Sequence, residues 1–366
     1  MNAPQALVDA EGVRAGVDAQ LDRHVSELAA ELAPLGATTI DLVEALRQAL
    51  AGGKRLRAAF CYWSWRAHGG ADKDRETVLR VGAALELFQA AALVHDDVMD
   101  ASDTRRGRPA AHRVFERMHL DAGWSGPAAR FGESGAILLG DLALVASERE
   151  LGDAIAGIDA DVRVAVRRTF DMMRTEVTAG QYLDVLAQAV PWGLDPAADE
   201  ARAREVVRAK SARYSVEHPM TLGACLAGAS QAVVADCAAI GLPLGEAFQL
   251  RDDLLGVFGD PRSTGKPAGD DLREGKRTVL VTRALSHAAA HDAALLRGRL
   301  GDADLGPDDI EALLEAIRRS GAVDQVDAMI SALADPALDA LAEADLAEPG
   351  RSMLVRLGQA AVHRAS

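Results

Sequence analysis

Two acidic clusters far apart in the sequence, Asp96-Asp97-Asp100 and Asp252-Asp253, are the residues with the clearest chemical potential. On a helix, Asp96 and Asp100 would lie one 5.4 Å turn apart on one face, where their like charges repel. A hard cation would relieve this repulsion, because magnesium prefers carboxylate oxygens and usually shares its coordination with substrate phosphates. The pattern therefore predicts one magnesium and diphosphate site made from both clusters.

A solvated acidic helix face is the alternative interpretation of the first cluster. The preceding stretch LELFQAAALV is almost wholly apolar, and a carboxylate at the end of a buried helix is costly unless it has a partner. The second cluster likewise ends an apolar stretch, FQLRDDLLGVFGD. The following segment, PRSTGKPAGDDLREGKRT, lacks the P-loop order but carries lysines that could close over phosphate oxygens. Two walls of one cavity are therefore expected.

Two compact basic motifs break the acidic trend, GGKRLR at 52–57 and RRGRP at 105–109. Arginine recognises phosphate in a bidentate manner, and glycine lets the backbone approach closely. Either motif alone could serve surface solubility. Because RRGRP follows the first acidic cluster by only five residues, the pair favours binding of a second diphosphate.

The elements that position these motifs are predicted to be helices. Alanine and leucine dominate, aromatic residues make up only 4% of the 366 residues, and both features favour helix over sheet. Apolar residues recur at helical spacing through 16–32, 40–51, 54–68, 75–101, 109–119, 135–152, 160–188, 201–231, 233–258 and 276–290. No interruption is typical of a flexible linker, so an all-α chain with a single domain over 1–366 is predicted, with a motif-bearing core about 50–290 and a helical tail 291–366.

The overall charge of the chain is acidic. A formal net charge of -15 disfavours nucleic acids and anionic membrane surfaces as partners, because both demand a basic face.

The start of the chain has no secretory pattern, so a cytoplasmic location is expected. The uncharged run 218–235 is interpreted as a buried helix and no membrane span is expected. The three cysteines match no zinc spacing and are interpreted as buried thiols.

An ordered series of motifs runs from about 50 to 290: GGKRLR, Gln89, DDVMD, RRGRP, GQYLD, KSARYS, and FQLRDD with TGKPAGDDLREGKRT. This series resembles the trans-isoprenyl diphosphate synthases of the polyprenyl synthetase family, most of all the bacterial geranylgeranyl diphosphate synthases. The resemblance implies an isoprenoid synthase fold, in which antiparallel helices surround a deep central cavity, and a homodimer. It also implies condensation of isopentenyl diphosphate with an allylic diphosphate.

The resemblance further implies roles for individual residues. Three magnesium ions would be ligated by Asp96, Asp100 and Asp252, with Asp97, Asp253 and Asp271 acting on their water shell. The allylic diphosphate would be held by Arg105, Lys210, Gln249, Lys266 and Lys276. Ser211 would lie beside Lys210, and Asp184 would orient the cations. Isopentenyl diphosphate would be held by Lys54, Arg57, Gln89 and Arg106. The metals would neutralise the leaving diphosphate, whose oxygen would later accept the proton.

The chain departs from the family pattern at one position. The second acidic motif of the family is often DDxxD, but here it reads DDLLG, with Gly256 in the fifth place. Asp260 or Asp270 could compensate for the missing aspartate.

Product length is predicted from the helix that carries the first cluster, along which the product grows in the resembled family. Ala91 and Ala92, one turn before Asp96, are small, and the next bulky group is Phe88, roughly 12 Å from Asp96 at 1.5 Å per residue. A floor at Phe88 predicts the twenty-carbon geranylgeranyl diphosphate, unless Phe88 only packs in the core.

Other functions remain as alternatives. The same chemistry could give a farnesyl or a longer product. A class I terpene cyclase is disfavoured, because the second cluster lacks an Asn/Ser/Glu metal triad and a cyclase needs no site for isopentenyl diphosphate. A non-catalytic partner subunit is disfavoured by the acidic clusters.

Overall fold

The computed structural model describes residues 7–259, 269–302 and 304–363 of the chain. Within these residues nearly all regular structure is helical, and the two strands are two residues each. This confirms the predicted all-α class. The chain divides into two compact units: unit 1 is Met1–Phe170, Pro219–Ala235 and Asp345–Leu357, and unit 2 is Asp171–His218, Asp236–Ala344 and Gly358–Ser366. The single-domain organisation stays a prediction.

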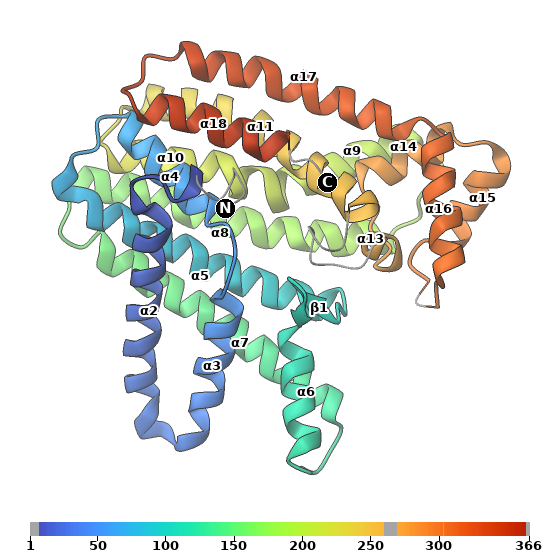
Figure 1. Ribbon diagram of the computed structural model, residues 1–366, viewed down its shortest axis with the longest axis horizontal. Helices are drawn as coiled ribbons and strands as arrows, with labels where there is room; N and C mark the ends of the chain where they lie inside the picture. Colours follow the sequence, from blue (N-terminus) through green and yellow to red (C-terminus); the bar gives the residue numbers. More distant parts are fainter. Residues whose placement is uncertain (1–6, 260–268, 303, 364–366) are drawn as a thin grey trace. The chain divides into compact units, whose positions relative to one another are not determined.

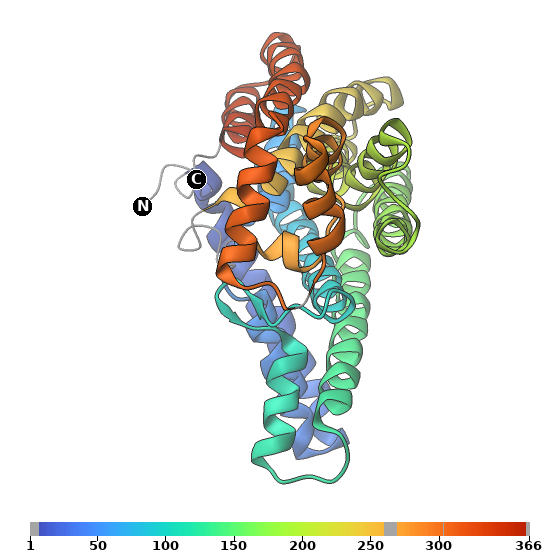
Figure 2. The same cartoon turned by 90° about the vertical axis from the view of Figure 1, so that its right-hand side faces the viewer.

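Unit 1 contains two helical hairpins, α2/α3 and α6/α7, and a short β-hairpin that follows the end of α5 (Figures 1 and 2). Its complete elements are η1 (Ala10–Gly12), α2 (Val13–Leu32), η2 (Ala33–Leu35), η3 (Ala37–Thr39), α3 (Ile40–Leu50), α4 (Leu56–Ala67), η4 (Asp72–Asp74), α5 (Arg75–Met99), β1 (Thr104–Arg105), β2 (Arg108–Pro109), α6 (Ala111–Asp121) and α7 (Ala128–Ala154).

Helix α5 is the core element of unit 1. It packs most extensively against α7 and also against α4 and α2. Helix α4 is apolar nearly all round and buries Phe60, Tyr62, Trp63 and Trp65, as a helix in the middle of a core should. Because α5 is packed against these helices, the backbone that carries the carboxylates at its C-terminal end is held in place.

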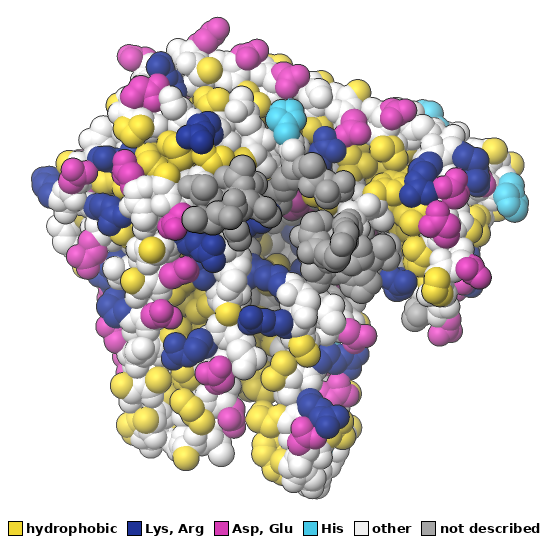
Figure 3. All heavy atoms as spheres, in the orientation of Figure 1, with side chains coloured by type: hydrophobic (Ala, Val, Ile, Leu, Met, Phe, Trp, Pro, Cys, Tyr) yellow, Lys and Arg dark blue, Asp and Glu magenta, His cyan; other side chains and the backbone are white. Residues whose placement is uncertain are grey.

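Apolar side chains gather on both helical hairpins of unit 1 in the space-filling view (Figure 3). Leu35 and Ile40 are exposed where α2 connects to α3, and Leu120 and Trp124 are exposed where α6 connects to α7. Trp124 and Phe131 form an edge-to-face pair with ring centroids 5.2 Å apart. The hairpin ends are therefore less polar than solvent-facing turns usually are.

Unit 2 is drawn from residues after Phe170. Its complete elements are α9 (Pro196–Val206), η5 (Val207–Glu217), α13 (Asp270–Arg273), α14 (Val279–His287), α15 (Ala290–Arg299), α16 (Pro307–Arg319) and α17 (Ala322–Glu343). The elements shared between the units are α8 (Ala160–Ala189), α10 (His218–Leu226), α11 (Gln231–Phe258) and α18 (Gly350–Val362).

The prediction of one continuous helix over 201–231 is wrong. Residues Val207–Glu217 form a π-helix, η5, between α9 and α10, and the chain leaves the helix after Leu226. The uncharged run 218–235 is therefore not one helix. π-Helical turns are rare and often occur at functional sites, and η5 carries Lys210 and Ser211.

Two helical stretches, Asp72–Met99 and Gln231–Phe258, are long and apolar enough to cross a membrane by length and composition alone. In their most apolar windows, 72% and 44% of the residues are buried within the protein. Buried core helices meet the same criterion, so this is weak support for a span.

Candidate active site

The first acidic cluster lies at the C-terminal end of α5. Asp96 and Asp97 belong to its last turn and are buried, and Asp100 follows as the cap residue, where its backbone N–H donates to Asp96 O at 2.8 Å. An apolar helix therefore delivers the three carboxylates together, as their spacing predicts. Carboxylates this well buried need partners.

Arg105 supplies that partner from the β-hairpin. The hairpin turns through Arg106 and Gly107, whose φ angles of 54° and 73° give a two-residue turn with both central residues left-handed. Arg105 Nε donates to Asp97 Oδ1 at 2.8 Å, and Nη2 lies 3.4 Å from Asp96 Oδ2. Arg105, which is predicted to bind the allylic diphosphate, is thus paired with Asp96 and Asp97, two carboxylates of the predicted metal site.

A group of cations surrounds Arg106. Burial lowers the pKa of Arg106, Glu86 opposes this shift, and the charges of Arg55, Arg105 and Arg57 add to it. A dianionic ligand would relieve the mutual repulsion of these guanidinium groups. The arrangement fits the predicted role of Arg57 and Arg106 as diphosphate ligands.

Arg55 is a residue of this region that the sequence reasoning missed. It adopts a left-handed backbone (φ 50°) and is buried, with Nη1 donating to Glu86 Oε2 at 3.0 Å and Nε to Asp18 Oδ1 at 2.8 Å. Its neighbour Lys54 is exposed, and Arg57 is half-buried. The motif GGKRLR gives no signal for which arginine turns inward.

In unit 2, Lys210 and Asp184 form an ion pair of 2.6 Å between η5 and α8. Gly180 of α8 permits this approach, because a Cβ there would lie 2.7 Å from Lys210 Cα and closer still to its backbone nitrogen. Ser211 is half-buried beside Lys210. The predicted orientation of Lys210 by Asp184 is consistent with this contact.

The second acidic cluster combines α11 with α13. Burial, followed by the charge of Asp271, raises the pKa of Asp253 to about 7, and Asp252 adds to the shift. Gln249 Nε2 donates to Asp253 Oδ1 at 2.8 Å and opposes it. Asp252 and Asp271 therefore lie close enough to disfavour the ionisation of Asp253, an effect that a bound cation would reverse.

Lys276 is a basic residue beside this cluster. Its Nζ lies 2.6 Å from Glu274 Oε2 and 4.0 Å from Asp271 Oδ1. Its charge lowers the pKa of Asp253, against the larger effect of burial. Lys266 and Asp260 lie outside the described residues.

The clusters differ from a preformed metal cage. In the described parts of the chain, no group of three His, Cys, Asp or Glu side chains is arranged to hold a metal ion. Magnesium is commonly bound by one or two carboxylates together with substrate phosphates. The donor chemistry of each cluster fits such a shared site.

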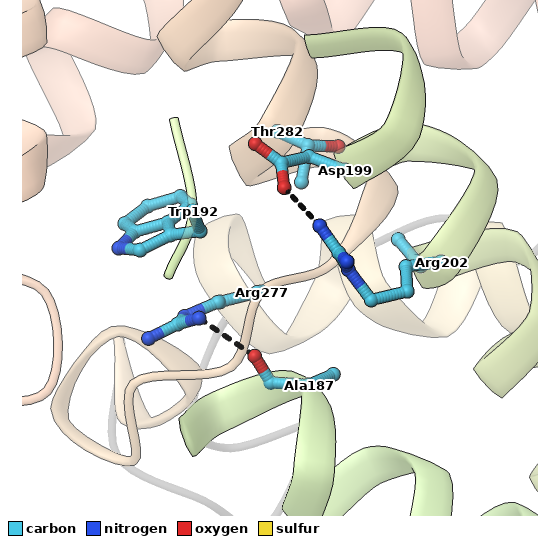
Figure 4. A pocket seen from close by; sticks show the side chains of 7 residues that line it. Ala187, Trp192, Asp199, Arg202, Arg277 and Thr282 are labelled. Atoms are coloured by element: carbon cyan, nitrogen blue, oxygen red, sulfur yellow. Dashed lines mark hydrogen bonds and ion pairs between the residues drawn. The ribbon is translucent and has the colours of Figure 1, made fainter. Parts of the chain in front are cut away.

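Arg277, the residue after Lys276, lines a small cavity, whose lining residues are shown in Figure 4. Arg277 Nη1 donates to Ala187 O at 2.7 Å and to Val190 O, and its guanidinium lies 5.0 Å from the Trp192 ring centroid. The space of about 10 Å³ suits one water molecule and no substrate. Arg277 therefore anchors the segment after Lys276 to the C-terminal end of α8.

The predicted chain-length residues lie along α5. Phe88 and Ala91 are buried, Ala92 is half-buried, and Gln89 is half-buried beside them. The Phe88 ring packs edge-on against Phe170 at 6.5 Å between centroids. This contact confirms that Phe88 is a core residue and leaves its role in product length a prediction.

Comparisons with known proteins agree on one family. A sequence model described as polyprenyl synthetase matches residues 41–317. A geranylgeranyl pyrophosphate synthase from Corynebacterium glutamicum, crystallised with isoprenyl diphosphate and magnesium, is 39% identical with a TM-score of 0.90, over 96% of this chain and 98% of that chain.

Curated relatives point the same way. A geranylgeranyl diphosphate synthase of Mycobacterium tuberculosis is 33% identical over 342 residues, which are 89% of this chain and 88% of the relative. A geranylfarnesyl diphosphate synthase of Aeropyrum pernix is 30% identical over 308 residues, which are 84% and 88% of the two chains. Relatives of similar identity thus carry names with different product lengths.

Proposed function

The chain belongs to the polyprenyl synthetase family and is a trans-prenyltransferase, and we propose that it condenses isopentenyl diphosphate head-to-tail with allylic diphosphates. The observation that supports this most is the repeated pairing of a carboxylate with a cation, the buried Asp97 with Arg105 and the half-buried Asp184 with Lys210. Such pairs keep both charges ready for a metal-diphosphate ligand.

Divalent metal ions serve this family, and we assign magnesium to the two acidic clusters. Asp96, Asp100 and Asp252 would ligate three ions, and Asp97, Asp253 and Asp271 would orient their water ligands. Bound magnesium would neutralise the departing diphosphate and so favour its ionisation. That both clusters act on the same ions is part of the proposal, and it rests on the family resemblance.

We assign different cationic side chains to the two substrates. Arg105, Lys210, Lys276 and Lys266, helped by Ser211 and Gln249, would hold the allylic diphosphate. Lys54, Arg57, Gln89 and Arg106 would hold isopentenyl diphosphate without metal. The gathering of positive charge around Arg106 supports the second assignment. With both anions fixed at short distance, the allylic C–O bond would break with its electron pair leaving on the diphosphate, and the double bond of isopentenyl diphosphate would form the new C–C bond. An oxygen of the released diphosphate would then accept the proton that the product loses.

We further propose that the product is geranylgeranyl diphosphate. The small side chains of Ala91 and Ala92 would leave room for the growing product beside α5, and Phe88, one turn before Ala92 on the same helix, would close that room. Phe88→Ala should lengthen the products in chromatography, with Phe60→Ala as a control for loss of a core ring on α4. An unchanged product length for Phe88→Ala would remove Phe88 from this role.

A homodimer is the proposed assembly, acting in the cytoplasm. On α7, Phe131, Leu138 and Val145 recur every seven residues and are 36%, 59% and 65% exposed. An exposed apolar stripe of this kind suits a second copy of the chain. Light scattering of Leu138→Glu/Val145→Glu should report a monomer, and a dimer that survives would place the interface elsewhere.

One assay tests the proposed activity. Purified protein with magnesium and labelled isopentenyl diphosphate should form product only when an allylic primer is added. A hydrocarbon formed from geranylgeranyl diphosphate alone would identify a cyclase instead. Inactivity with every primer would favour a non-catalytic partner subunit.

A further inference from the structure

Gly256 is the one position in the second acidic motif that departs from DDxxD, and the structure gives it a neighbour. A Cβ built on Gly256 would lie 2.7 Å from Asp271 Cγ, and closer still to Oδ2. Real Cβ atoms essentially never approach other atoms within 3.0 Å. The carboxylate of Asp271 therefore occupies the space in which a side chain at position 256 would begin.

The carboxylate reaches this space from a different element. Gly269, with φ 72°, precedes α13, whose second residue is Asp271, and Lys276 N donates to Asp271 O at 3.0 Å. On α11, Asp252 and Gly256 are four residues apart and share one helix face. Asp271 thus adds its charge to the face that carries Asp252.

We propose that Asp271 supplies from α13 the carboxylate that the fifth residue of the motif would supply from α11, and that Gly256 is required to make room for it. The role of that carboxylate toward a metal-bound diphosphate rests on the proposed function, whereas the replacement in space rests on geometry alone. Restoring aspartate at position 256 would displace Asp271 and add no donor.

The helix itself makes a glycine here unexpected. Glycine is disfavoured in a helix interior relative to alanine. Gly298 of α15 is also helical, but a Cβ there would meet nothing within 4 Å. The two glycines therefore form a matched pair, in which only Gly256 has a neighbour that requires the absence of a side chain.

Thermal unfolding in EDTA tests the geometry without metal or activity. Gly298→Ala should raise Tm by about 1–3 °C through helix propensity. Gly256→Ala should lower Tm in the wild-type background and raise it, as Gly298→Ala does, in the Asp271→Ala background. Equal shifts of Tm by Gly256→Ala in both backgrounds would show that the Asp271 carboxylate does not occupy this space.

Binding of inorganic diphosphate at fixed magnesium, measured by calorimetry, tests the replacement. Asp271→Ala and Gly256→Asp should each weaken binding by about tenfold or more. The double variant Gly256→Asp/Asp271→Ala should bind more tightly than either single variant, because one carboxylate again fills the space. Binding by Gly256→Asp as tight as wild type, or no recovery in the double variant, would overturn the proposal. A wild-type protein that binds no diphosphate would instead contradict the proposed function, and the unfolding experiment would still decide the geometry.

Discussion

The two acidic clusters have similar residues but different charge balance. In unit 1, Arg105 donates to Asp97 and lies 3.4 Å from Asp96, so a guanidinium already neutralises part of the cluster. In unit 2, Asp253 is buried near Asp271 and its pKa is raised to about 7. The first cluster is stabilised by its own cation, whereas the second carries repulsion that an added cation would relieve.

This difference leads to different expectations for the two clusters. A cluster with its own cation keeps its shape without ligand, because the ion pair fixes both partners. A cluster without enough cation binds protons or metal to lower its charge. We therefore expect the stability of the first cluster to depend on Arg105. The stability of the second cluster should depend on pH and on bound magnesium.

The largest effect is expected from Arg105→Ala. Removing one partner of a buried ion pair costs about 3–5 kcal/mol, and because Arg105 is partly exposed we expect a loss near 3 kcal/mol. Condensation should fall by about 10²–10³-fold, since a cation facing the diphosphate is lost. Urea unfolding and the labelled assay measure the two effects.

Arg113→Ala is the control for that experiment, because Arg113 pairs with the exposed Asp103 and the half-buried Glu116. It should lose no more than about 1 kcal/mol. Similar losses for both arginine variants would mean that Arg105 has no special role in the first cluster.

Asp253→Asn should have the next largest effect, now on stability. The carboxyl has a pKa near 3.8 in the unfolded chain and near 7 in the folded protein. Between these values the folded state holds a proton that the unfolded state lacks, so the free energy of unfolding falls as pH rises. In EDTA at pH 8, the Asp253→Asn substitution should therefore stabilise the protein by up to about 4 kcal/mol.

The pH dependence checks the sign of that prediction. At pH 4 or below, Asp253→Asn and wild type should unfold with nearly equal free energies. Asp339→Asn, at an exposed position on α17, should change neither value. A stabilisation by Asp253→Asn that is the same at pH 4 and pH 8 would contradict the repulsion in the second cluster.

The smallest effect is expected from Arg277→Lys, which tests the anchor next to Lys276. Lysine cannot reproduce the paired donation to two carbonyls or the stacking on Trp192, so a loss of about 1–2 kcal/mol is expected. KM for the allylic primer should rise more than KM for isopentenyl diphosphate. Arg117→Lys, on the exposed face of α6, serves as the control, and equal changes in both KM values would argue against an effect through Lys276.

Much of this arrangement could be predicted from the sequence, for identifiable reasons. The periodicity of apolar residues predicted α5 and the carboxylates at its end, because helical spacing and burial act locally. The π-helix η5 was not predictable, since its hydrogen-bond shift leaves no pattern in side-chain types. Nor was the burial of Arg55 with Glu86, which depends on a pairing 31 residues apart.

Gly256 shows the same limit within the site. Its oddness was visible in the sequence, and Asp260 or Asp270 were expected to compensate. Asp260 lies outside the described residues, and compensation by Asp270 stays a prediction. The structure places the carboxylate of Asp271 against Gly256, and Asp271 is buried whereas Asp270 is half-buried. Which of two adjacent aspartates faces inward depends on the left-handed Gly269 before α13, and sequence spacing does not determine it.

Condensation of labelled isopentenyl diphosphate with an allylic primer tests the central claim, that both clusters act on one metal-bound diphosphate. With excess magnesium, Asp96→Ala and Asp252→Ala should each lose about 10²–10³-fold in kcat, and the double variant should lose little more, because residues acting as a unit are not additive. Near wild-type condensation by either single variant, or losses that multiply in the double variant, would contradict the claim.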